Sequence, residues 1–267
     1  MTLGDWACDL QVSCERFAPE STAIGAGVHA IVNFAAETHV DRSILSPEAF
    51  LRTDILGTHV LLEAVRKHGI SRYLQVSTDE VYGDVSEGES SENDTLRPRS
   101  PYSASKAGGD LQVLAYWTTY SVPVIITRGS NTYGPYQYPE KLIPLFVTNL
   151  IDDQQVPLYG DGLQIRDWLH VEDHARGIMH ALEHGEIGNV YNIGVGANIS
   201  VLELVAQLNR LLGTSIEPQH GPPRPGDVRH SQADITRARR DLGYDPTVDF
   251  AEGLRRTVEW YQRSVGG

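Results

Sequence analysis

The sequence predicts an α/β protein in which a doubly wound parallel sheet carries helices on both faces and is joined to a smaller C-terminal lobe. Two observations predict this fold class. Short apolar runs alternate with longer amphipathic runs along the 267 residues, and polar side chains follow directly on one of the apolar runs, at Ser77. The length is sufficient for a large core in one sheet with a lobe beside it.

The expected strands are short apolar runs with polar or Gly residues at their ends. In chain order, Ile31-Val32-Asn33-Phe34 lies in the first, and Tyr73-Leu74-Gln75-Val76 forms most of the second. Strands are expected at residues 30–35, 72–77, 123–128 and 189–193. Because longer helical patterns separate them, they are expected to pair in parallel.

The helix expected at 47–68 has a broad apolar face that includes Phe50, Ile55 and Leu61. Further helices are expected at 103–120, 139–152, 171–184, 200–212, 234–241 and 249–264. The residues His170, Glu172, Asp173 and His174 are expected to cap and begin the helix at 171–184 rather than bind a metal, because no His-Glu-x-x-His spacing occurs. Residues 213–226 hold four prolines and predict an irregular segment that could close over a ligand.

The clearest chemical signal is Ser77-Thr78-Asp79-Glu80 at the end of the second strand, followed by Tyr102 and Lys106 near a helix start. Ligands bind at the carboxyl ends of strands in α/β sheets. The i, i+4 spacing places Tyr102 and Lys106 on one helix face, where a lysine lowers the pKa of a neighbouring phenol. A phenolate can take a proton from an alcohol while a nicotinamide cofactor accepts the hydride.

Asp79 and Glu80 are adjacent carboxylates, which can serve as acid and base if their surroundings separate their pKa values. Taken singly, each motif has an ordinary alternative: a solvated strand-to-loop corner for the carboxylates, and a surface helix for Tyr102 and Lys106. The longer string from Thr78 to Gly83 favours a catalytic site over these alternatives.

Several longer segments carry a family resemblance. They are residues 34–43, 53–58, 130–135, 139–144, 159–162, 165–168 and 224–229. In this order, across roughly residues 29–263, they resemble the extended short-chain dehydrogenase/reductase family and, within it, the dTDP-glucose 4,6-dehydratases. Asp54 stands where that family usually has Asn.

The resemblance implies a Rossmann-like fold that binds NAD. Residues 28–129 with 166–194 would form the NAD-binding domain, and residues 130–165 with 195–267 the nucleotide-sugar lobe. The implied cofactor contacts are Phe34, Ala35, Ala36, Glu37, Thr38, Thr53, Tyr102 and Lys106. The family's helices that match 47–68 and 103–120 form a homodimer, although these apolar faces would equally fit helices that only cover the sheet.

The resemblance also implies roles in catalysis. Tyr102, supported by Lys106, would be the base at sugar C4, and Thr78 would bond the 4-hydroxyl. Glu80 would take the C5 proton, and Asp79 would protonate the departing C6 hydroxyl. The implied contacts with dTDP-glucose are Thr38, Thr78, Asn131, Lys141, Leu142, Ile143, Pro157, Tyr159, Arg166, Asn198, Arg224 and Arg229.

Residues 1–27 depart from the family, which begins with a strand, a Gly-rich turn and a helix for the cofactor pyrophosphate. We therefore expect an atypical, N-terminally truncated chain with weak NAD binding. Gly25-Ala26-Gly27 precedes a strand and Gly194-Val195-Gly196 follows one, so neither is expected to be that turn. Two alternatives stay open: a 4-epimerase or decarboxylase of the same family, favoured by residues 224–234, and an inactive remnant.

Composition sets further bounds. The net charge is −13 and the sequence pI about 5.1, which argues against a nucleic-acid partner. No apolar run reaches the ~20 residues that span a bilayer, so no membrane partner is expected. No signal peptide pattern is present, and Cys8 and Cys14 form neither a disulfide framework nor a zinc cluster. A cytoplasmic location without a metal is expected.

Overall fold

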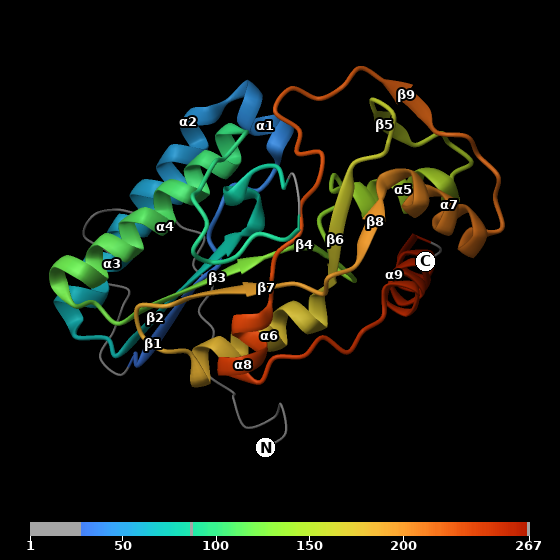
Figure 1. Cartoon of the computed structure of the whole chain (residues 1–267). Helices are drawn as coiled ribbons and strands as arrows, with labels where there is room; N and C mark the ends of the chain where they lie inside the picture. Colours follow the sequence, from blue (N-terminus) through green and yellow to red (C-terminus); the bar gives the residue numbers. More distant parts are fainter. Residues whose placement is uncertain (1–27, 86–87, 266–267) are drawn as a thin grey trace.

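The computed structural model describes residues 28–85 and 88–265. Its main sheet has four parallel strands in the order β1-β2-β3-β7 (Figure 1). The strands are β1 (Ala30–Asn33), β2 (Arg72–Thr78), β3 (Val124–Gly129) and β7 (Val190–Ile193). The predicted parallel sheet is therefore confirmed, with boundaries shifted by one or two residues. Every residue of β3 is buried, as expected for a strand covered on both faces.

Helices cover both faces of this sheet (Figure 1). On one face α3 (Gly57–His68) and α4 (Pro101–Tyr120) pack against Tyr73 and Ile126. On the other, α6 (Val171–His184) and α8 (Thr236–Leu242) pack against Leu74 and Ile125. Adjacent strand residues point to opposite faces, so each pair of neighbours contributes to both cores.

The helix expected at 47–68 is divided in the structure. A short α2 (Pro47–Phe50) leads into a π-helical turn, η2 (Leu51–Leu56), and then into α3; a further helix, α1 (Val40–Leu45), comes before them. The turn buries Asp54, which accepts hydrogen bonds from the Glu37 N–H at 3.2 Å and the Ser105 hydroxyl at 2.5 Å. π-turns often occur at functional sites, and apolar spacing in the sequence does not reveal them.

Two helix starts are fixed by their caps. Ser100 and Ser103 form a capping box with Pro101 in the first turn, so α4 begins two residues earlier than expected. His170 caps α6 by accepting the Glu172 N–H at 3.3 Å, as predicted from the sequence.

The remaining elements form a lobe beside the sheet (Figure 1). The helices α5 (Leu142–Ile151), α7 (Val201–Leu212) and α9 (Phe250–Val265) share one core. Short strands that the sequence analysis did not expect line this lobe: β4 (Asn131–Tyr133), β5 (Pro157–Tyr159), β6 (Ile165–His170), β8 (Asn198–Ser200) and β9 (Gln219–Gly221). In the lobe, β6 lies between β4 and β8. The segment Gly129–Asn131 connects β3 of the main sheet to β4 of the lobe.

Candidate functional site

Thr78, Asp79 and Glu80 lie where β2 ends and a 3₁₀ turn, η3 (Asp79–Tyr82), begins. The Thr78 hydroxyl caps this turn by accepting the Glu80 N–H at 3.3 Å. The cap turns the chain sharply, so Asp79 points into the protein and is only 3% exposed. A carboxyl at the carboxyl end of a sheet strand thus lies away from bulk water.

The surroundings of Asp79 favour its protonated form. Burial raises the pKa of Asp79 to about 7; nearby Glu80 and Asp167 raise it as well, whereas a hydrogen bond from Ser231 and the charge of Arg166 lower it. A carboxyl with this pKa can donate a proton near neutral pH.

Glu80 is partly buried, and burial raises its pKa too. The charges of Arg166, Arg224 and Lys141 oppose this rise, which means that three cations lie close to Glu80. Because these cations counter the effect of burial, Glu80 is better suited than Asp79 to accept a proton.

Tyr102 and Lys106 both come from the first two turns of α4 and are buried. Burial raises the pKa of Tyr102, the Glu80 charge adds to the rise, and hydrogen bonding to Thr78 opposes it. The Lys106 ammonium donates to the Val76 carbonyl at 2.7 Å. The expected lowering of the Tyr102 pKa toward neutrality is not found in this arrangement, because burial and nearby carboxylates disfavour the phenolate.

The three arginines predicted to hold a diphosphate have different surroundings. Arg166 and Arg224 share one carboxylate oxygen of Asp227, at 3.1 and 2.6 Å. Arg229 instead pairs with Asp161 at 2.6 Å on the surface. Because Arg166 and Arg224 also influence Glu80, they form one cationic cluster beside it, and Arg229 lies outside that cluster.

Several other predicted substrate contacts lie around this cluster. The Tyr159 ring lies 5.5 Å from the Arg224 guanidinium carbon, and the Lys141 ammonium donates to the Thr38 carbonyl. Asn131 has a buried side-chain oxygen without a hydrogen-bond partner among the residues described, which leaves an acceptor for a ligand.

The remaining predicted substrate contacts are placed less favourably. The Ile143 side chain is buried in the lobe core, whereas Leu142 is only partly buried. Pro157 is exposed at the start of β5. Asn198 is exposed and bonds to the Gln232 side chain at 2.6 Å.

The predicted cofactor contacts border the carboxyl end of β1. Phe34, Ala35 and Thr38 are exposed in the loop after the strand, Ala36 and Glu37 are partly buried there, and Thr53 lies on η2. The neighbouring Ser77 hydroxyl on β2 is buried without a hydrogen-bond partner in the described chain. An open loop beside buried Tyr102 and Lys106 fits the nicotinamide end of NAD.

Gly194-Val195-Gly196 joins two strands, β7 and β8, so it is not the Gly-rich turn before a helix that holds a cofactor pyrophosphate. Gly25-Ala26-Gly27 and the rest of residues 1–27, which the sequence analysis set apart, lie outside the described residues.

A segment far along the chain from Asp79 crosses the site. Residues 224–234, here called the strap, carry Arg224, the Asp227 carboxylate and the Ser231 hydroxyl, which donates to Asp79 at 2.5 Å. The Arg-x-x-Asp spacing could have suggested the Arg224–Asp227 pair. No local signal pointed to Ser231, because 152 residues separate it from Asp79.

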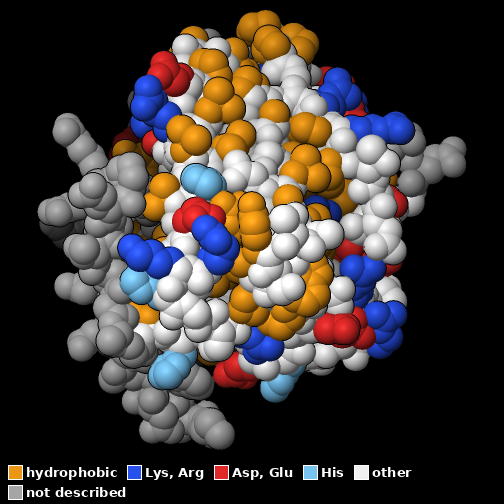
Figure 2. All heavy atoms as spheres, turned by 90° about the vertical axis from the view of Figure 1, so that its left-hand side faces the viewer, with side chains coloured by type: hydrophobic (Ala, Val, Ile, Leu, Met, Phe, Trp, Pro, Cys, Tyr) orange, Lys and Arg blue, Asp and Glu red, His pale blue; other side chains and the backbone are white. Residues whose placement is uncertain are grey.

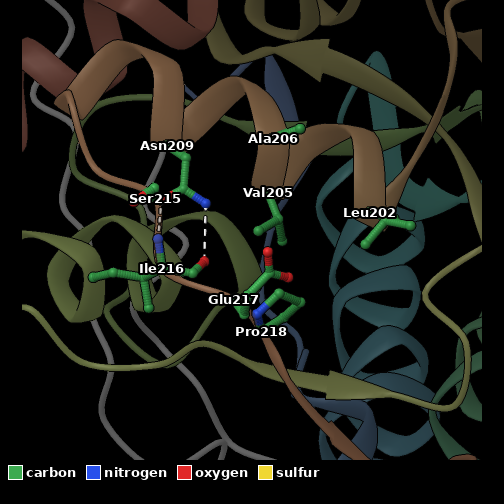
Figure 3. Close-up of a pocket in the computed structure, with 8 residues that line it drawn as sticks. All are labelled: Leu202, Val205, Ala206, Asn209, Ser215, Ile216, Glu217 and Pro218. Atoms are coloured by element: carbon green, nitrogen blue, oxygen red, sulfur yellow. Dashed lines mark hydrogen bonds between the residues drawn. The ribbon is translucent and has the colours of Figure 1, made fainter.

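A separate pocket of about 200 Å³ lies on the lobe between α7 and the segment Ser215–Pro218 (Figure 3). Asn209 lines the pocket but already bonds both the N–H and the C=O of Ile216, so its polar groups hold the loop in place (Figure 3). No group of His, Cys, Asp and Glu in the described chain is arranged to hold a metal. None of the described helices is long and apolar enough to cross a membrane.

Comparison with known proteins identifies relatives of this chain. The family described as GDP-mannose 4,6 dehydratase matches residues 24–257. The dTDP-glucose 4,6-dehydratase of Streptomyces niveus is 52% identical over 239 residues, which is 89% of this chain and 71% of the relative. The enzyme of that name from Streptomyces griseus is 51% identical over 241 residues, 89% of this chain and 73% of the relative.

Solved structures similar to this chain include a dehydratase and an epimerase. DesIV, a dTDP-glucose 4,6-dehydratase from Streptomyces venezuelae crystallised with NAD bound, has a TM-score of 0.88 and 48% identity, covering 90% of this chain and 75% of that one. A UDP-glucose 4-epimerase from Thermotoga maritima with UDP-glucose has a TM-score of 0.85 but only 32% identity, covering 89% and 78%. The dehydratase is therefore more similar in sequence than this epimerase.

Proposed function

Because this chain belongs to the family of the dTDP-glucose 4,6-dehydratases, within the extended short-chain dehydrogenases/reductases, we propose that it removes water from dTDP-glucose to give the 4-keto-6-deoxy sugar. The observation that carries this proposal is the pair of neighbouring carboxyls on η3. Asp79 is buried with a pKa of about 7, and Glu80 lies among three cations. The two groups can thus act as an acid and a base at adjacent carbons.

The two parts of the molecule divide the binding. Residues 28–129 with 166–194 hold NAD, with the nicotinamide end over the loop after β1, and residues 130–165 with 195–267 hold the nucleotide sugar. Arg166 and Arg224 suit the diphosphate, because guanidinium groups offer paired donors to phosphate oxygens. Bound NAD supplies a positively charged ring that accepts a hydride and later returns it.

The residues of the site then act in order. Tyr102 acts as its phenolate, which the positive ring of bound NAD and the Lys106 ammonium on the same helix face would favour, and takes the proton of the 4-hydroxyl, which Thr78 orients. The resulting 4-ketone acidifies the C5 proton, which moves to the Glu80 carboxylate. The C5 electron pair forms the C5–C6 double bond as the C6–O bond breaks, and Asp79 protonates the departing hydroxyl, which leaves as water.

The acid–base pair separates this function from its closest alternative. A 4-epimerase oxidises and reduces the same carbon and needs no second proton donor at C6. Because burial raises the pKa of Asp79 to about 7, this carboxyl can supply the second proton that dehydration needs. The strap resembles epimerases in sequence, but in this chain it bonds to Asp79 through Ser231.

We also propose that α3 and α4 mediate a homodimer. Figure 2 shows hydrophobic side chains gathered over the face that carries α2, α3 and α4. The exposed members on these helices and on η2 are Leu51, Leu56, Leu111, Trp117 and Tyr120. Such a patch favours a protein partner, and a helix face suits a second copy. In sedimentation experiments the Leu111→Lys variant should shift a dimer toward monomer; a wild-type monomer would contradict the proposal.

The decisive experiment for the activity is incubation of the full chain with NAD and dTDP-glucose, followed by chromatography and mass spectrometry of the sugar nucleotides. The proposal expects a product lighter by one water that carries a 4-ketone. Conversion to the galacto epimer without loss of mass would favour the 4-epimerase instead. The Asp79→Asn variant serves as the matched control and should yield no dehydrated product.

A further inference from the structure

The strap brings one hydroxyl into the acid–base site from far along the chain. Ser231 is 2% exposed, and its hydroxyl donates to Oδ2 of Asp79 at 2.5 Å. The Thr78 hydroxyl donates a longer hydrogen bond, at 3.4 Å, to the other carboxyl oxygen, Oδ1. Within the described residues these are the hydrogen bonds that the Asp79 carboxyl makes, and the one from Ser231 is much the shorter.

The backbone on both sides of Ser231 is held in place. Its own N–H donates to the Ile165 carbonyl of β6 at 3.3 Å. Before it, the main-chain N–H groups of Arg229 and His230 both donate to one oxygen of Asp84, at 2.5 and 3.1 Å. After it, the Ser90 main chain bonds to the backbone of Gln232 and Asp234, at 2.9 Å each. The Ser231 hydroxyl is therefore presented to Asp79 by a fixed backbone.

The other groups that face Asp79 act through charge or bulk. Glu80 follows it on η3, Asp167 and Arg166 come from β6, and Tyr102 comes from α4. The two carboxylates raise the pKa of Asp79, and Arg166 lowers it. None of them determines which of the two carboxyl oxygens carries the proton.

We propose that Ser231 is a positioning residue whose hydroxyl occupies Oδ2 of Asp79 and so directs the transferable proton to Oδ1, on the side of Thr78. This inference rests on the proposed dehydratase function and assigns a role to the strap within it. In the step concerned, the proton leaves Oδ1 for the departing hydroxyl oxygen as the C–O bond breaks. Water departs, and Asp79 remains as a carboxylate that Ser231 stabilises.

Such a role has a consequence that a purely structural serine would not have. Because Ser231 donates to Asp79, it stabilises the carboxylate and lowers the pKa of Asp79. Removal of the hydroxyl in Ser231→Ala should shift the titration midpoint of Asp79 upward by roughly one pH unit, the equivalent of one lost hydrogen bond. Ser231→Thr keeps a hydroxyl and should restore the original midpoint.

The first measurement needs neither NAD nor turnover. The full chain is labelled with ¹³C at the Asp carboxyls, and the Asp79 signal is assigned by its loss in Asp79→Asn. Ser90→Ala is the matched control: Ser90 is also buried, and it contacts the strap through its main chain. An unmoved midpoint in Ser231→Ala, or the same shift in Ser90→Ala, would overturn the proposal.

The second measurement is the pH profile of dehydration. In Ser231→Ala, kcat should fall while KM for dTDP-glucose stays unchanged, and the alkaline limb should move to higher pH, because Asp79 keeps its proton longer. Ser90→Ala should match the wild type. A fall in kcat without movement of the limb would contradict positioning. If the wild type does not dehydrate dTDP-glucose, the proposed function fails, and the titration alone decides the contact between Ser231 and Asp79.

Discussion

Two neighbouring regions of the site differ in whether their ionisable side chains have a partner of opposite charge. At the end of β2 and the start of α4, Asp79 and Tyr102 are buried with no cation of the described residues in direct contact, and the pKa of each is raised because burial disfavours the charged form. Beside this region, Arg166 and Arg224 share the carboxylate of Asp227, so part of their positive charge is already balanced. Under the proposed function, the groups assigned to proton transfer are therefore buried without full charge compensation, whereas the cations assigned to anion binding are held by a carboxylate partner.

The largest expected effect is on the reaction rate, when a buried side chain at the end of β2 or the start of α4 is replaced. Tyr102→Phe should slow C4 oxidation by ~10²–10⁴-fold, the usual loss when a general base is removed. Glu80→Gln should leave that oxidation measurable and abolish exchange of the C5 proton. Both are followed in ²H₂O by mass spectrometry of the sugar, with reduced nicotinamide monitored by absorbance. If both variants lose the same step equally, the assignment of roles is wrong.

A compensated pair inside the buried region provides the next test. Arg128 bonds Asp110 at 2.9 Å, and both side chains are almost fully buried beneath the site. Arg128→Leu leaves Asp110 charged and alone, so the free energy of unfolding should fall by roughly 3–5 kcal/mol. Urea denaturation measures this. Arg229→Leu, which breaks an exposed pair with Asp161, is the control and should change stability little.

The pH dependence of stability tests Asp79 directly. Its folded pKa, about 7, lies above the unfolded value of 3.8, so the folded state holds this proton more tightly. The resulting stability is fully present below pH ~4 and is lost as the pH rises through ~7, in total roughly 4 kcal/mol. Urea denaturation at pH 5 and pH 8 should show this loss in the wild type and a smaller one in Asp79→Asn. Identical losses in both proteins would exclude Asp79 as the source.

The smallest expected effect is on the affinity for dTDP, and it distinguishes Arg224 from Arg229. Arg224→Ala should weaken binding of dTDP by ~10–100-fold, because charge-assisted hydrogen bonds contribute ~1.5–3 kcal/mol each. Arg229→Ala should change the affinity far less, since Arg229 lies outside the cluster at Glu80 and pairs with Asp161. Calorimetric titration with dTDP compares the two. A larger loss in Arg229→Ala would place the diphosphate on the surface side of the strap.

The sequence predicted the sheet and its larger helices well, because buried strands and amphipathic helices have a periodicity that can be read locally. Helix α6 matched its expected bounds, and the parallel direction of the main-sheet strands was predicted correctly from the alternation of strands and helices. The three-residue strands of the lobe escaped prediction, as did η2, because partners far along the chain determine them rather than their own residues.

The candidate site shows the same division. Thr78, Asp79, Glu80, Tyr102 and Lys106 could be named because they sit in compact motifs. Their electrostatics could not be predicted: the sign of the shift at Tyr102 depends on burial, which needs three dimensions. The Ser231 contact and the shared carboxylate of Asp227 likewise require a fold in which the strap crosses the end of β2.

The contact between Ser231 and Asp79 also orders events during synthesis. It closes a loop of 152 residues, and contacts so distant in sequence form late because the entropy of loop closure opposes them. On the ribosome, β2 and β3 can pair while the strap is still untranslated, since chains fold from the N-terminal side as they emerge. The hydrogen bond from Ser231 to Asp79 can therefore form only after the strap has been translated, 152 residues after Asp79 itself.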